Sequence, residues 1–179
     1  GKQYGYSTGS EGYNTGALWI RQDWLDELNL QPPKTIQDIE NVALAFMQAG
    51  KCKSGIAFNS GAGGMFGQWI GILPLFNAFG SFPDIWIDDG NGGAVYGAVQ
   101  PETKEALATL ASWTEKGIFD KGMLALANGD QVRDTYIATS EVGMYFDAWW
   151  DPWPSWDYKG SAAANSNKDV NWAPYAAPV

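Results

Sequence analysis

The stretch GALWIRQDWLDELNLQPPKTIQDIENVALAF, residues 16–46, predicts a strand followed by two helices. Its first segment, Gly16–Arg21, is a short apolar run with β-branched and aromatic content, as in a buried strand. Apolar residues recur at helical spacing from Trp24, and a pair of prolines then ends that short helix. Thr35 and Asp38 have the spacing of a capping box, which indicates the start of a longer amphipathic helix.

Short apolar runs and helical patterns continue to alternate after this stretch. In the helix that opens at Pro101, the apolar pattern predicts a buried side that includes Leu107. The alternation as a whole predicts an α/β fold in which a small mixed sheet is flanked by helices. The further expected elements are a strand at Gly55–Phe58, a bent helix at Gly67–Phe79, a hairpin around the turn Asp88–Gly93, a helix at Asp130–Ala138, and strands at Glu141–Phe146 and Asn171–Tyr175.

Charge and composition exclude several classes of function. The chain has 179 residues, a formal net charge of −9 and no histidine. Nucleic acids and anionic membranes bind basic faces, so neither is an expected partner. The absence of histidine excludes Ser-His-Asp and Cys-His catalysis and removes the commonest metal ligand. We therefore expect no cofactor and no metal site, and the sequence contains no apolar run long enough to span a membrane.

Three local patterns have ordinary structural interpretations. The glycine-rich run Gly61–Gly67 lacks the spacing of a nucleotide-binding loop, so it predicts a turn or a close backbone approach to a ligand. Asp84 and the turn Asp88–Gly93 lack the spacing and the closing glutamate of a calcium loop, which favours a solvated hairpin. Cys52 lies between two lysines, which could lower the pKa of its thiol, and the alternative is a non-functional thiol near a helix end.

The stretch MYFDAWWDPWPSW, residues 144–156, holds four tryptophans in thirteen positions. A flat, exposed ring such as that of Trp149 or Trp150 can stack on the apolar face of a sugar, while neighbouring carboxylates and amides bind the sugar hydroxyls. The alternative is that these rings fill a small core beneath a long loop. We expect a mixture, with one or two rings facing a ligand.

Two other hypotheses stay open on the residues alone. Paired carboxylates perform glycoside hydrolysis, and Asp147 could act with Asp151 or Asp157. A structural or partner-docking domain is the third hypothesis, with the acidic helices near Pro101 and Asp130 as the contact surface. Sequence spacing does not show whether two of these carboxylates face each other at a catalytic separation, so it does not decide between the hypotheses.

Three motifs follow one another along the chain: ALWIRQDWLDELNLQPPKTIQDIENVALAF (17–46), FGSFPDIWIDDGNGGAVYGAVQPETKEALATLASWTEKGIFDKG (79–122) and EVGMYFDAWW (141–150). Their order resembles the extracellular solute-binding proteins of ABC importers, sugar-binding family 1. The resemblance implies a single lobe of the type II periplasmic-binding-protein fold. It also implies that residues 1–179 form one domain, the second lobe of a two-lobed protein whose N-terminal lobe is missing from this chain.

The same resemblance implies a binding protein and not an enzyme. Its expected ligand is a carbohydrate, in particular an oligosaccharide, held in a cleft between two lobes. Its expected partner is the membrane permease of an ABC importer, and its expected location is extracellular, as a membrane-anchored lipoprotein, or periplasmic. The residues that the resemblance places at the ligand are Tyr13 and Asn14 before the first strand, Met65, Phe66 and Trp69 near the glycine-rich run, and Asp147, Trp149 and Trp150 after the Gly-Met strand.

Overall fold

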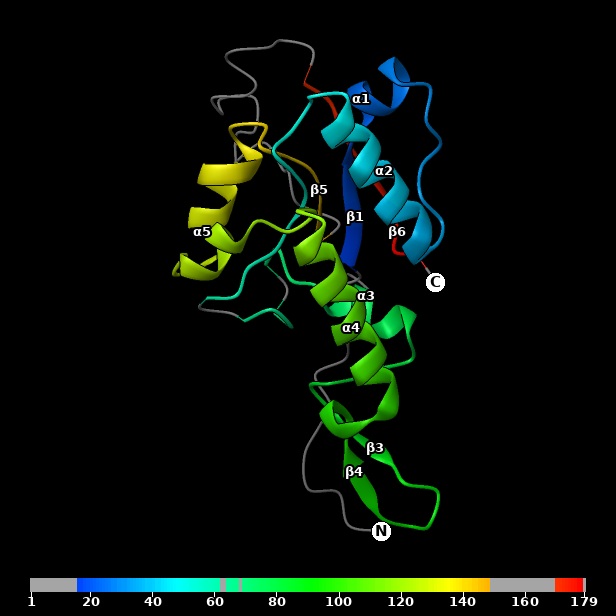
Figure 1. The fold of residues 1–179 in the computed structure, drawn as a ribbon. Helices are drawn as coiled ribbons and strands as arrows, with labels where there is room; N and C mark the ends of the chain where they lie inside the picture. Colours follow the sequence, from blue (N-terminus) through cyan, green and yellow to red (C-terminus); the bar gives the residue numbers. More distant parts are fainter. Residues whose placement is uncertain (1–15, 62–63, 68, 149–169, 179) are drawn as a thin grey trace.

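The computed structural model of the protein describes residues 16–61, 64–67, 69–148 and 170–178. The main sheet in this part of the chain has four strands. Helices lie beside this sheet and a separate hairpin projects from the far end of the molecule (Figure 1), so the predicted α/β class is confirmed. The elements are β1 (Gly16–Arg21), α1 (Gln22–Glu27), α2 (Ile36–Gln48), β2 (Ser54–Ala57), α3 (Leu73–Ala78), β3 (Trp86–Asp88), β4 (Ala94–Tyr96), α4 (Pro101–Glu115), α5 (Gly129–Val132), β5 (Val142–Ala148) and β6 (Trp172–Ala176).

The strand order β2-β5-β1-β6 makes the sheet mixed. Strand β1 runs antiparallel to both β5 and β6, whereas β2 and β5 are parallel. Gly16, the first residue of β1, pairs with Ala148 at the end of β5, and Ala17 pairs with Ala176 at the end of β6. One edge of the sheet therefore gathers the start of β1 and the ends of two strands that are distant in sequence.

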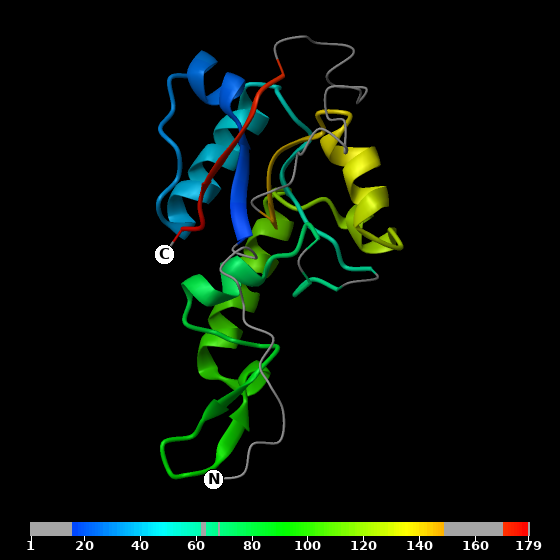
Figure 2. The ribbon, with the colours of Figure 1, turned by 180° about the vertical axis from the view of Figure 1, so that it is seen from behind.

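Helix α2 covers one face of the sheet, and its start matches the sequence prediction. Thr35 Oγ1 accepts a hydrogen bond from the Asp38 amide at 3.1 Å, and the Asp38 carboxylate accepts one from the Thr35 amide at 3.0 Å. This confirms the capping box. The buried side of α2 includes Phe46, whose ring meets that of Trp24 edge-on at 5.3 Å between centroids. Seen from behind, β6 and β1 lie in front of this helix (Figure 2).

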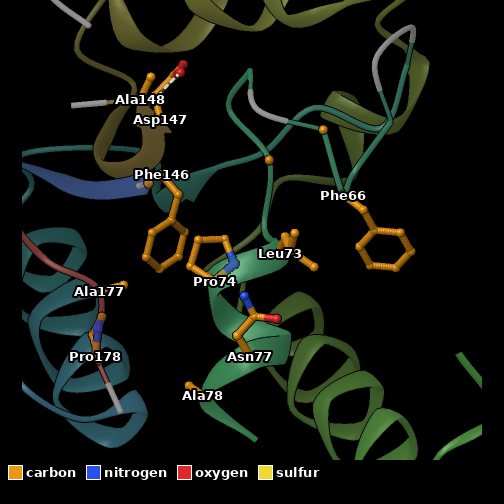
Figure 3. Close-up of a pocket in the computed structure, with 13 residues that line it drawn as sticks. Phe66, Leu73, Pro74, Asn77, Ala78, Phe146, Asp147, Ala148, Ala177 and Pro178 are labelled. Carbon is orange, nitrogen blue, oxygen red and sulfur yellow. Dashed lines mark hydrogen bonds between the residues drawn. The ribbon is translucent and has the colours of Figure 1, made fainter. Parts of the chain in front are cut away.

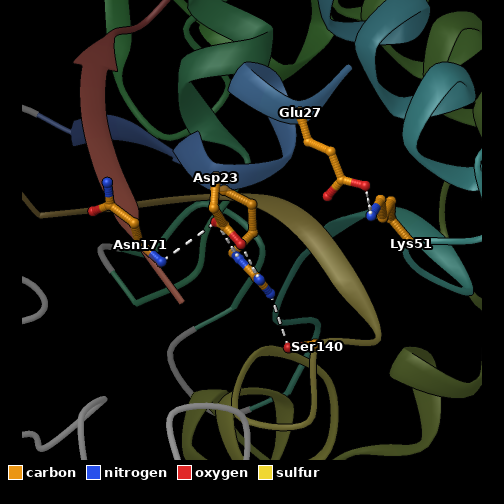
Figure 4. Close-up of polar contacts among 6 residues, drawn as sticks. Asp23, Glu27, Lys51, Ser140 and Asn171 are labelled. Atoms are coloured by element: carbon orange, nitrogen blue, oxygen red, sulfur yellow. Dashed lines mark hydrogen bonds and ion pairs between the residues drawn. The ribbon is translucent and has the colours of Figure 1, made fainter. Parts of the chain in front are cut away.

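Arg21, at the end of β1, is buried and joins three parts of the chain, and Figure 4 labels its partners Asp23 and Ser140. Its Nε donates to Asp23 at 2.8 Å and its Nη1 donates to the Ser140 hydroxyl at 2.9 Å. Its guanidinium also lies over the ring of Trp24, 4.0 Å from the centroid. The Asp23 carboxylate in turn accepts from the Asn171 amide, just before β6. A buried charge with this set of partners fixes the end of the sheet opposite to Gly16.

Two details of the predicted helices are wrong. The helix expected at Gly67–Phe79 begins only at Leu73, because Ile70 has a φ of 52°, which an α-helix does not contain. A Cβ added at Gly71 would lie 2.0 Å from the Gly67 carbonyl oxygen, so the backbone there folds back on itself. In α4, Leu107 is 49% exposed, since the buried side passes through Thr103, Ala106 and Trp113.

The hairpin β3–β4 carries exposed apolar side chains, and the turn between its strands is polar. Trp86 is 68% exposed and contacts Tyr96 on the neighbouring strand. The Asp89 carboxylate accepts hydrogen bonds from the amides of Asn91 and Gly93, which fixes the turn and lowers the pKa of Asp89. Within the described residues no group of acidic side chains is placed to hold a metal ion. Residues 88–93 are all exposed, as expected for a solvated hairpin turn.

None of the helices in the described part of the chain combines the length and apolar character needed to span a bilayer.

Cys52 is predicted to be an unreactive thiol, because burial raises its pKa to about 12. We expect it to react with a disulfide reagent at pH 8 on the order of a hundred times more slowly than free cysteine, since little thiolate is present. Absorbance of the released thiolate measures the rate, and unfolding the chain in guanidinium should restore the rate of a free thiol. Fast labelling of the folded chain would show instead that the flanking lysines activate the thiol.

Candidate functional site

A pocket of about 450 Å³ opens at the edge of the sheet where β1 begins and β5 and β6 end (Figure 3). Helix α3 and the loop before it form the opposite wall. The pocket exists at this place because the sheet register brings the three strand ends together. Its lining residues are Gly16, Phe66, Gly67, Gly71, Leu73, Pro74, Asn77, Ala78, Phe146, Asp147, Ala148, Ala177 and Pro178.

Most of the lining is apolar. The Phe146 ring faces Pro74, and Leu73 lies beside Pro74 on the same wall (Figure 3). Asn77, one turn further along α3, brings an exposed side-chain amide to the lining. An apolar surface with a small number of polar groups is typical of a small-molecule site. It also suits a sugar, whose ring faces are apolar and whose hydroxyls bind amides and carboxylates.

Asp147 is the buried polar residue of this pocket, with 3% of its surface exposed. Its Oδ2 accepts a hydrogen bond from the Ile70 amide at 3.1 Å, and its Oδ1 accepts one from the Ala148 amide at 2.7 Å. Ile70 has a left-handed backbone, which is strained for a β-branched residue. The carboxylate therefore holds the strained loop against the end of β5 and shapes one wall of the pocket.

We predict that Asp147→Asn lowers the free energy of unfolding by about 1–3 kcal/mol, because a side-chain amide then replaces an oxygen that accepts a backbone N–H. Denaturant unfolding followed by circular dichroism measures the change. Asp84→Asn, at an exposed carboxylate, is the matched control and should change the stability by less than about 0.5 kcal/mol. Equal changes in unfolding free energy for the two substitutions would contradict the proposal that Asp147 anchors the loop.

The structure brings together part of the expected site. Phe66 and Asp147 both line the pocket, although the Phe66 ring packs edge-on against Phe76, with 5.0 Å between centroids. Trp69 is 45% exposed and Met65 is half-buried, and neither is among the lining residues. The other expected ligand residues, Trp149, Trp150, Tyr13 and Asn14, lie outside the described residues.

Several lining residues were missed by the sequence analysis, namely Gly16, Pro74, Asn77, Phe146 and the Ala177–Pro178 pair. Phe146 was expected only as a buried strand residue, and Pro74 only as a bend in a helix. The signal in the sequence that could have indicated some of these lining residues was the position of Gly16 and Ala177 near the ends of predicted strands. The strand order that places those ends side by side is not readable from spacing.

The hydrolase hypothesis requires Asp147 to act on a ligand, but its carboxylate is already bonded within the chain. Both oxygens of Asp147 accept backbone hydrogen bonds, which suits a structural acceptor. The two proposed partners, Asp151 and Asp157, lie outside the described residues.

Comparison with known proteins gives two curated relatives. The fructooligosaccharide ABC transporter substrate-binding protein FusA of Streptococcus pneumoniae serotype 4 is 30% identical over 163 residues, which cover 85% of this chain and 27% of FusA. The polygalacturonan/rhamnogalacturonan-binding protein YtcQ of Bacillus subtilis is 27% identical over 126 residues, which cover 70% of this chain and 25% of YtcQ. The chain thus spans about a quarter of the length of these relatives, and their names describe binding proteins and not enzymes.

Solved structures share the fold. The alginate-binding protein AlgQ2 superposes with a TM-score of 0.70 at 20% identity, covering 91% of this chain and 32% of AlgQ2. FusA of S. pneumoniae in complex with kestose superposes with a TM-score of 0.61 at 25% identity, covering 99% of this chain and 34% of FusA. No protein-family model matches the chain.

Proposed function

The chain is a relative of the substrate-binding proteins of sugar ABC transporters, and from this premise we propose that it is one lobe of such a protein and captures an oligosaccharide. The observation that carries the proposal is the pocket at the edge of the sheet, which gathers Phe146 from β5 with Pro74 and Asn77 from α3. Residues 1–179 form the second lobe in this proposal, and an N-terminal lobe supplies the facing wall of a cleft.

Cleft closure is the proposed mechanism. The ligand first contacts one lobe and is buried when the second lobe closes over it, because the closed state makes more contacts with the ligand than the open state. The aromatic rings of Trp149, Trp150 and Phe66 supply stacking surface in this mechanism. Tyr13 and Asn14, Met65 and Trp69, and Asp147 border the same cleft. No bond in the ligand is broken.

The proposed partner is the membrane permease of an ABC importer, to which the loaded protein delivers its ligand. Delivery requires that the protein lie on the outer side of the membrane that holds the permease. The protein is therefore extracellular and attached to the membrane as a lipoprotein, or it is periplasmic. The naming of FusA as an ABC transporter substrate-binding protein supports this assignment.

Intrinsic tryptophan fluorescence tests the proposal during titration with neutral and acidic oligosaccharides. The titration is made on this chain and on the two-lobed protein that contains it. We expect saturable quenching or a blue shift that is weak for the chain and at least tenfold tighter for the two-lobed protein, since the second lobe adds its own contacts. An absence of any response to every sugar in both proteins would refute carbohydrate binding.

A further inference from the structure

We infer that the ligand of the pocket is an uncharged oligosaccharide and not a polyuronate. The inference rests on the proposed function, and it names the class of sugar that the site accepts. It separates two chemistries found among the relatives. Fructooligosaccharides carry no charge. Polygalacturonan and alginate are polymers of uronic acids, with a carboxylate on each uronate unit.

The charge of the pocket lining carries the inference. Among the lining residues that the structure describes, Asp147 is the charged side chain and Asn77 is the neutral polar one, and no lysine or arginine is present. Sites that bind a carboxylate use the charge-assisted donors of arginine or lysine. A uronate in this pocket would lie beside the carboxylate of Asp147, and none of the described lining residues offers it a cationic donor.

The described cations lie elsewhere, and most are already paired with carboxylates. Five of them form ion pairs inside the chain: Arg21, Lys51, Lys53, Lys116 and Arg133. The remaining three are Lys34, before α2, Lys104, in α4, and Lys121, after α4, and none of them lines the pocket. A polyanion would therefore approach a lobe with a formal net charge of −9 and no compensating cation at the described pocket wall.

Neutral sugars carry no charge, so they are not repelled by Asp147 or by the net negative charge of the chain and need no cationic donor. Their hydroxyls can donate to backbone carbonyls at the strand ends and can donate to or accept from the Asn77 amide, which lies on the exposed side of α3. The half-buried Leu73 and Pro74 offer apolar surface to a pyranose or furanose face in either case, whereas the Phe146 ring is buried. The charge of the lining, and not its shape, therefore favours neutral oligosaccharides over polyuronates.

Isothermal titration calorimetry of the two-lobed protein tests the inference with two matched panels of three to five sugar units. One panel holds neutral fructo-, malto-, xylo- and manno-oligosaccharides, and the other holds oligogalacturonates and oligoalginates. We expect the tightest neutral sugar to bind at least tenfold more tightly than any acidic one at 0.15 M salt. An acidic sugar as the tightest ligand overturns the inference and leaves the proposed function standing, whereas binding of neither panel overturns both.

Asn77→Lys and Asn77→Asp form a charge-reversal pair at one exposed position of the lining. We expect Asn77→Lys to strengthen and Asn77→Asp to weaken oligogalacturonate binding, each at least threefold, with both effects shrinking at 0.5 M salt because salt screens charge. For the neutral sugar we expect both variants to weaken binding, because each keeps only a donor or only an acceptor in place of the Asn77 amide. Opposite effects of the two variants are therefore expected for the acidic sugar alone. Equal oligogalacturonate affinities of the two variants would show that acidic sugars do not meet this wall, and would overturn the charge argument.

Discussion

Trp113→Ala is expected to lower the free energy of unfolding by about 3–5 kcal/mol, the range for removing a large buried aromatic side chain. Trp113 is fully buried on α4, its ring lies 5.6 Å from that of Phe119, and its Nε1 donates to the Glu40 carboxylate at 2.8 Å. It therefore joins α4 to α2, and through α2 to the sheet. Guanidinium unfolding measures the loss, and a loss below about 1 kcal/mol would contradict this role.

Trp113→Phe isolates the hydrogen bond, because it keeps most of the ring and removes the N–H donor. The hydrogen bond from Lys116 and the one from Trp113 lower the pKa of Glu40. A lowered folded-state pKa stabilises the protein above the ordinary pKa of a glutamate, and that contribution is lost as the pH falls through the folded-state pKa. The stability gap between wild type and Trp113→Phe should therefore narrow between pH 7 and pH 3. A constant gap would contradict the assignment.

Gly55→Ala is the second large effect, with an expected loss of about 1–3 kcal/mol from overpacking. A Cβ added at Gly55, in β2, would lie 2.4 Å from the Ala43 Cβ in α2 and 3.2 Å from Ile118. The helix approaches the strand so closely because neither residue carries more than a methyl group. Denaturant unfolding of the single variant measures the loss.

Ala43→Gly tests whether that clash is the cause. In the double variant Gly55→Ala/Ala43→Gly, the methyl group moves from helix to strand, so the closest contact is removed. We expect the loss of unfolding free energy in the double variant to be smaller than the sum of the two single-variant losses by at least about 1 kcal/mol. Strictly additive losses would mean that Gly55 is needed for its backbone and not for the space it leaves.

The elements with local signals were predictable from the sequence. The Thr35–Asp38 capping box fixes the start of α2, and the structure contains both of its hydrogen bonds. The pattern for α4 predicted the helix but assigned Leu107 to the buried side, because periodicity alone leaves the width of the buried stripe undefined. The prediction of a helix from Gly67 was wrong, because the hydrogen bond from the Ile70 amide to Asp147 is non-local. That bond stabilises a left-handed backbone at Ile70, which local propensity opposes.

The candidate site was predictable only in part for the same reason. Phe66 and Asp147 belong to loops or strand ends that the sequence marked as ligand contacts, and both line the pocket. Gly16, Phe146 and Ala177 come together only because β1 lies between β5 and β6. That order is set by pairing across more than 120 positions of the chain, as in the Gly16–Ala148 pair, and no spacing rule reports it.

The most direct test of the central claim is a crystal structure of the two-lobed protein bound to its tightest oligosaccharide. We expect a sugar unit at this edge of the sheet, with its ring against the half-buried Pro74 and a hydroxyl within hydrogen-bond distance of Asn77. The rest of the ligand should contact the facing lobe. A sugar bound elsewhere on the protein, with solvent filling this pocket, would show that the pocket is not the ligand site.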